Sequence, residues 1–150
     1  MAKEYRKFNA QERSELFSYC IFSIVWSVGS VVEFEHRFLF DAYFGKQYIK
    51  NELLTTFKDI PPESRIPDDQ SIFDIYFDNA KKNWQPFSRH LGVGKLREGL
   101  KYHELFIPTI NSVRNKYILN SMIVQESPFL LYGKTGTGKT QVIKNLILEE

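Results

Sequence analysis

Apolar and polar positions in the first part of the chain follow a helical period. Residues 16–32 read LFSYCIFSIVWSVGSVV and carry no charge. The apolar side chains of this stretch fall on one stripe of a helix and its serines gather on another side. The stripe holds Phe17, Ile21, Ile24, Val25, Val28, Val31 and Val32, and the serines are Ser23, Ser27 and Ser30. Asn9 followed by Glu12 has the form of a capping box, so we expect a helix that starts near Ala10 and ends or bends at Gly29.

This uncharged run is seventeen residues long, whereas a membrane-spanning helix usually needs roughly 20. Because the run has an apolar side and a serine-containing side and is not uniformly apolar, we interpret it as a buried helix of a soluble domain. The same interpretation makes Cys20, the single cysteine, a small buried apolar side chain.

Residues 33–78 alternate between apolar segments and residues that interrupt helices and strands. Residues 33–44 form a second, aromatic-rich helical stretch, which we expect to end at Gly45. Residues 58–71 contain three prolines and predict a loop. The phrase IFDIYFD that follows alternates with a period of two, which predicts a short, half-buried strand. Its inward side chains are Phe73, Ile75 and Phe77.

The pattern changes again after this strand. Residues 84–87 predict an apolar turn, and residues 89–104, with three glycines, predict a connector. We therefore place a boundary after His103, which divides the chain into a mostly helical region, 1–103, and a second region, 104–150. In the second region Thr109 or Asn111 can cap a helix.

The rest of the second region predicts a strand, a glycine-rich loop and a helix in that order. The phrase SPFLLY, residues 127–132, is short and apolar with its proline near the start, as strands tolerate. The loop follows at Gly133, and the helix begins at about Lys139. A strand, loop and helix in this order form the context that a phosphate-binding loop requires.

Residues 133–140, GKTGTGKT, match the motif G-x-x-x-x-G-K-[ST] in full. Glycines let successive backbone N–H groups converge on an anion, and the following helix adds its positive end. In this motif Lys139 reaches the β/γ-phosphates and the Thr140 hydroxyl is a ligand of Mg²⁺. We predict ATP and Mg²⁺ as cofactors and the whole loop as the phosphate site: Gly133, Lys134, Thr135, Gly136, Thr137, Gly138, Lys139 and Thr140.

Composition narrows the possible partners, metal sites and activities of the chain. A net charge of +2 is too small to favour nucleic acid or a membrane surface as a partner. One cysteine excludes an internal disulfide, and three dispersed histidines predict no structural metal. No residue after Thr140 supplies the acidic strand or arginine finger that phosphoryl transfer needs. We assign no catalytic residue, and we expect this chain to bind nucleotide without turning it over.

Three phrases in order resemble one family, the dynein heavy chains. FSIVWSVGS (residues 22–30) and IFDIYFDNAKKNWQPFS (72–88) look like the helical extension between the second and third AAA+ modules of the motor ring. LFIPTINSVRNKYILNSMIVQESPFLLYGKTGTGKT (105–140) looks like the opening of the third module. The resemblance covers residues 16–148. It implies an α/β fold: a mostly helical N-terminal extension, then the first β–P-loop–α unit of an incomplete AAA+ domain, truncated after the phosphate loop.

The resemblance also implies a nucleotide base near Ile107, Pro108 and Thr109, for which ordinary packing is an equal alternative. The chain departs from the family's common Asp-Thr at Asn111-Ser112, where helix capping survives but a carboxylate contact does not. It keeps the family's arginine at Arg114, for which an exposed helical charge is the alternative.

The implied parent is an ATP-driven microtubule motor in which this module binds nucleotide and regulates the ring. Its partners would be the rest of the heavy-chain ring and the intermediate and light chains, with microtubules contacted only through regions outside this chain. Its location would be the cytoplasm and cytoskeleton, or the axoneme of a cilium. Two alternatives stay open: an unrelated P-loop ATPase or kinase, and a non-catalytic interaction protein.

Overall fold

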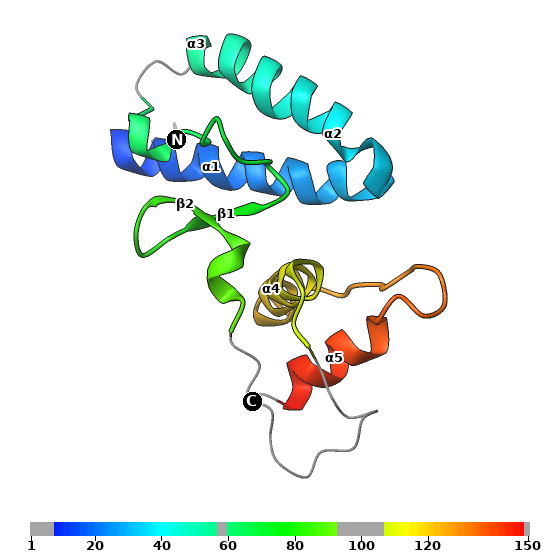
Figure 1. Cartoon of the computed structure of the whole chain (residues 1–150). Helices are drawn as coiled ribbons and strands as arrows, with labels where there is room; N and C mark the ends of the chain where they lie inside the picture. Colours follow the sequence, from blue (N-terminus) through cyan, green and yellow to red (C-terminus); the bar gives the residue numbers. More distant parts are fainter. Residues whose placement is uncertain (1–7, 57–59, 93–106, 149–150) are drawn as a thin grey trace, which may run out of the picture. The chain divides into compact units, whose positions relative to one another are not determined.

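The computed structural model describes residues 8–56, 60–92 and 107–148 (Figure 1). The chain divides into two compact units, Met1–Pro86 and Phe87–Glu150. The boundary predicted after His103 falls within 93–106, outside the described residues. Each unit has its own apolar core.

The first unit opens with helix α1 (Ala10–Ser27), and its predicted capping box is confirmed. The Glu12 N–H donates to Asn9 Oδ1 at 2.8 Å, and the Asn9 N–H donates to Glu12 Oε2 at 2.9 Å. The N–H of Glu12, in the first turn of the helix, and the N–H of the N-cap residue Asn9 both find a partner in this way. The two bonds fix where the helix starts.

The buried face of α1 is turned relative to the predicted stripe. Its buried residues are Ser14, Ser18, Ile21 and Val25. Ile24, Val28 and Cys20, which the sequence placed inside, are exposed. The buried Ser18 hydroxyl is satisfied within the helix, because it donates back to the Ser14 carbonyl at 3.1 Å.

By length and composition alone, Ala10–Val31 could cross a membrane, a test that the core helix of a soluble protein also passes. Residues of this helix belong to the apolar core of the first unit. This packing supports the interpretation of α1 as a core helix.

A continuous helical run follows, drawn in cyan in Figure 1. It comprises a 3₁₀ turn η2 (Phe34–His36), α2 (Arg37–Phe40), a π-helix η3 (Asp41–Leu53) and α3 (Leu54–Thr56). The predicted end at Gly45 is wrong, since the helix passes through this residue. A Cβ at Gly45 would lie 2.7 Å from Asp41 Oδ1 and 2.7 Å from Ile72 Cγ2. Glycine therefore serves close packing here, not helix termination.

After the short turn η4 (Pro62–Ser64), the chain forms a hairpin of β1 (Ile75–Asp78) and β2 (Asn83–Pro86). The strands are antiparallel and pair Ile75 with Pro86 and Asp78 with Asn83. β1 was predicted, but Tyr76 is buried with its neighbours, so the strand is not half-exposed. The predicted apolar turn at residues 84–87 is wrong, because most of this segment is β2.

Aromatic rings join the hairpin to the helices. Phe73 lies edge-on to Trp26 at a centroid distance of 5.9 Å and 5.8 Å from Phe40. The Arg37 guanidinium lies 4.9 Å above the Phe73 ring. Trp84 packs on Phe77 and donates its Nε1–H to the Ser64 carbonyl at 2.9 Å. The buried core of this unit is Ile21, Val25, Ile49, Ile72, Phe73, Ile75, Phe77 and Trp84.

The second unit contains η5 (Phe87–His90), α4 (Ile110–Val124) and α5 (Lys139–Leu148). Helices α4 and α5 share a small core of Leu119, Val142 and Leu146. The predicted strand at residues 127–132 is not formed, and no described segment pairs with it. A strand needs a neighbour to bond its backbone groups. Leu131 still packs on the core, while Leu130 and Tyr132 are 90% and 95% exposed.

We predict that Gly45→Ala destabilises the first unit by about 1–2 kcal/mol, because overpacking outweighs the gain in helix propensity. Trp26 and Trp84, the only tryptophans, both lie in this unit, so tryptophan fluorescence during urea unfolding measures its stability. The wild-type chain is the reference, and an unchanged unfolding midpoint in Gly45→Ala would contradict the packing role of Gly45.

A second prediction concerns pH. Lys82 Nζ lies 3.0 Å from Glu15 Oε2 and ties the hairpin turn to α1. The hydrogen bond from Lys82, and then that from Gln11, lower the pKa of Glu15 below its ordinary value. A lowered pKa in the folded state means that this contribution is complete above the ordinary pKa of a glutamate and is lost as pH falls through the folded pKa.

Glu15→Gln should therefore reduce the loss of stability between pH 6 and pH 3 by roughly 0.2–1 kcal/mol, the usual worth of a partly exposed pair. Urea unfolding at each pH measures this loss. Lys82→Met should reduce it similarly, and a steeper pH dependence in either variant would contradict the assignment.

Candidate phosphate-binding site

The loop between Tyr132 and α5 owes its curvature to two of its three glycines. Gly136 has φ +82° and Gly138 has φ +80°, values that other residues rarely adopt. Gly133 lies outside that region, and a Cβ there would meet only ordinary contacts, the nearest 3.6 Å away. The sequence treated the three glycines alike, and the structure separates them.

The loop ends where α5 begins, at Lys139, as predicted. The Val142 N–H donates to the Gly138 carbonyl at 3.0 Å and closes the first turn. The positive end of a ten-residue helix therefore faces the loop.

The Lys139 side chain folds back into the loop. Its ammonium donates to the Gly133 carbonyl at 2.9 Å, to the Lys134 carbonyl at 2.7 Å and to Thr137 Oγ1 at 3.1 Å. The Thr137 hydroxyl in turn donates to the Lys134 carbonyl at 2.9 Å. These bonds hold a positive charge beside the loop backbone.

A hollow of about 570 Å³ lies over this loop and the first turn of α5. Its lining runs from Gly133 to Gln141, with Lys134 left out, and contains no acidic residue. Glycine backbone, threonine hydroxyls, a lysine and a helix N-terminus suit an anion with several oxygen atoms. The Thr140 residue that the motif assigns to Mg²⁺ lies on this lining.

The residues predicted to lie near the nucleotide base, Ile107, Pro108 and Thr109, precede helix α4 and are not part of the loop. Thr109 caps α4, since its Oγ1 accepts from the Ser112 N–H at 3.2 Å and its own N–H donates to Ser112 Oγ at 2.8 Å. Ser112 thus completes a capping box at the position where the chain departs from the family pattern. Ile107 is 70% exposed.

Arg114, for which an exposed charge was the alternative, is 5% exposed. The exposed-charge alternative is therefore wrong for this arginine.

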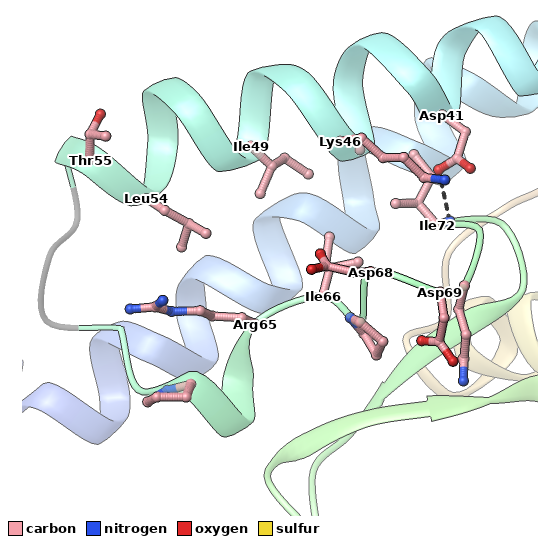
Figure 2. A pocket seen from close by; sticks show the side chains of 14 residues that line it. Asp41, Lys46, Ile49, Leu54, Thr55, Arg65, Ile66, Asp68, Asp69 and Ile72 are labelled. Atoms are coloured by element: carbon pink, nitrogen blue, oxygen red, sulfur yellow. Dashed lines mark hydrogen bonds between the residues drawn. The ribbon is translucent and has the colours of Figure 1, made fainter.

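Sequence reasoning missed a second hollow of about 730 Å³ in the first unit (Figure 2). Ile49 and Leu54 point into it from the helical run, and Pro62, residues 65–70 and Ile72 line it from the following segment. The dashed line in Figure 2 joins the Asp41 carboxylate to the Ile72 N–H at 3.1 Å. The charged side chains on its lining have both signs: Asp41, Lys46, Arg65, Asp68 and Asp69.

This mixture of charges suits a triphosphate less than the loop of the second unit does. Two of the carboxylates, Asp68 and Asp69, are adjacent and would repel phosphate oxygens. In the described part of the chain, no group of three or more His, Cys, Asp or Glu side chains could hold a metal ion.

Family models match both parts of the chain. Residues 95–150 match the P-loop containing dynein motor region, and residues 2–89, more than half of the chain, match the dynein heavy chain AAA lid domain. This chain belongs to the dynein heavy chain family. The resemblance drawn from the sequence is confirmed, and an unrelated P-loop ATPase or kinase gains no support.

Curated relatives agree. The chain is 29% identical over 140 residues to dynein axonemal heavy chain 3 of Homo sapiens, with 85% of this chain and 3% of the relative covered. It is 33% identical over 138 residues to dynein heavy chain-like protein 2 of Plasmodium falciparum, with 88% and 2% covered. It is 30% identical over 142 residues to the dynein gamma chain of the flagellar outer arm of Chlamydomonas reinhardtii, with 93% and 3% covered.

The chain therefore spans only 2–3% of the length of these dynein heavy chains. No solved structure matches it significantly. The structure combines helices with a small antiparallel sheet, and the family model adds a P-loop dynein motor region.

We predict that Gly138→Ala disturbs the loop and Gly133→Ala does not. Alanine at φ +80° costs about 1–2 kcal/mol. Amide exchange of Val142, which is bonded to the Gly138 carbonyl, should therefore accelerate about 5- to 30-fold in Gly138→Ala when measured by NMR. The Gly133→Ala variant should exchange at the wild-type rate, and equal acceleration in both variants would count against the distinction between these glycines.

Proposed function

We propose that this dynein heavy chain segment binds ATP with Mg²⁺ at Gly133–Thr140 and serves a nucleotide-binding, regulatory module of the parent motor. The observation that carries the proposal is the Lys139 ammonium, which lies against the loop carbonyls at the edge of an acid-free hollow. A positive charge held in the loop, together with the N-terminus of α5, favours polyphosphate over neutral ligands.

Each residue has a proposed role at this site. Lys139 would bind the β/γ-phosphates, and the Thr140 hydroxyl would hold Mg²⁺, which neutralises phosphate charge when bound. Backbone N–H groups between Gly133 and Gly138 would bind the remaining phosphate oxygens. Ile107, Pro108 and Thr109 are proposed to lie near the base.

In the same proposal, the exposed segment 127–132 is the first strand of a β–P-loop–α unit of an AAA+ module. Its alternation supports this, since Leu131 packs inward while Leu130 and Tyr132 are exposed. Residues 1–103 would be the extension or lid, and 104–150 the start of the nucleotide-binding module.

The chemistry proposed for these residues is binding, because no carboxylate of the described chain lines the loop to orient a water molecule. Hydrolysis and movement along microtubules would belong to the parent heavy chain. The proposed partners are the rest of that chain and dynein intermediate and light chains. Two of the relatives above are named as an axonemal and a flagellar outer-arm chain, which favours the cytoskeleton of a cilium or flagellum.

We predict that Lys139→Ala abolishes stabilisation by Mg-ATP. At a nucleotide concentration tenfold above Kd, the wild-type chain should gain about 1.4 kcal/mol, or several degrees in the melting temperature of a small unit. Differential scanning calorimetry with and without Mg-ATP measures this gain.

The matched control is Lys144→Ala, which removes an exposed lysine of α5 that does not line the hollow. It should shift as the wild type does. An equal shift in wild type and Lys139→Ala would sink the proposed function.

A further inference from the structure

The bonds of Lys139 use the full donor capacity of its ammonium. A lysine ammonium has three N–H donors, and Lys139 makes three hydrogen bonds within the loop. A phosphate oxygen can accept a hydrogen bond from this group only after one of those bonds breaks. The bond to Thr137 Oγ1, at 3.1 Å, is the longest of the three and the first candidate for exchange.

Thr137 has a double role in this arrangement. Its hydroxyl accepts from Lys139 and donates to the Lys134 carbonyl at 2.9 Å. The same carbonyl accepts from Lys139 at 2.7 Å, so Lys134, Thr137 and Lys139 form a closed ring of hydrogen bonds. The motif requires no hydroxyl at position 137, because this position is one of its four unspecified residues.

We propose that Thr137 is a latch that holds Lys139 against the loop and lowers the affinity of the site for nucleotide phosphate. This inference rests on the proposed function and adds a regulation of the same site. A charged phosphate oxygen is a stronger acceptor than a hydroxyl, so it displaces Thr137 from Lys139. The apparent affinity is reduced because only the open-latch fraction of molecules can bind.

The space around the lysine permits this movement. A Cβ at Gly133 would lie 3.8 Å from Lys139 Cδ and 3.9 Å from Nζ, so no side chain of residue 133 blocks the lysine, which contacts this residue through its carbonyl. Hydrogen bonds to the Gly133 and Lys134 carbonyls and to the Thr137 hydroxyl, rather than steric confinement, keep the ammonium in place, and the bond to Thr137 is the longest of them.

The test compares Thr137→Val, which keeps the shape and removes the hydroxyl, with Thr137→Ser, which keeps the hydroxyl. Titration calorimetry with Mg-ATP should give a Kd about 2- to 10-fold lower for Thr137→Val, the usual effect of one neutral hydrogen bond. Thr137→Ser should bind as the wild type does. Ser121→Ala is the control, since it removes another exposed hydroxyl, bonded to the Tyr117 carbonyl at 2.9 Å on α4.

A second measurement tests the latch without nucleotide. Reductive methylation followed by mass spectrometry reports how readily the Lys139 amine reacts. Thr137→Val should raise its reaction rate several-fold, while the rate at Lys144 stays constant as an internal reference.

The two measurements separate the possible failures. An unchanged methylation rate at Lys139, or a Kd for Thr137→Val equal to or above that of the wild type, overturns the latch. Faster methylation with a lower Kd supports it. The proposed function fails separately, if Lys139→Ala leaves Mg-ATP binding intact.

Discussion

The first unit depends on how closely Ile72 and Phe73 approach the helices. Each residue packs against a glycine, where no side chain separates it from the helical backbone. Phe73 lies against Gly29, at which a Cβ would be 3.0 Å from the ring, and Ile72 lies against Gly45 at 2.7 Å. The buried Asp41 carboxylate accepts a hydrogen bond from the Ile72 N–H. This bond fixes the position of Ile72 along the helix that carries Asp41. The hairpin begins two residues after Phe73, so its position follows from this contact.

Local signals in the sequence were sufficient for some of these features. The capping box at Asn9 and Glu12 acts over three residues, and the start of α5 at Lys139 follows from the loop motif. The continuation of the helix through Gly45 could not be predicted in the same way. Gly45 is required by Ile72, 27 positions further along the chain, and no local pattern contains that contact. The buried face of α1 was misplaced for a related reason, because its small serines pack inward.

The candidate site shows the same division. The motif predicted the loop, its lysine and the following helix, because those features depend on neighbouring residues. It could not show that Gly133 differs from Gly138 in backbone conformation, nor that the Thr137 hydroxyl joins the lysine. Both facts depend on how the loop closes in space, which places Lys139 next to a carbonyl six residues earlier.

The segment at residues 127–132 gives the loop two unequal ends. On one side α5 is anchored to α4 through Val142 and Leu146. On the other side, Leu131 alone of the segment packs its side chain on that core. Any strand that pairs with this segment would restrict the loop's free end and lower the entropy lost when a ligand orders it. Thermodynamic linkage then requires the converse, so that a bound ligand would tighten the pairing by the same factor. One coupling free energy would thus determine both how strongly the strand pairs and how tightly the ligand binds.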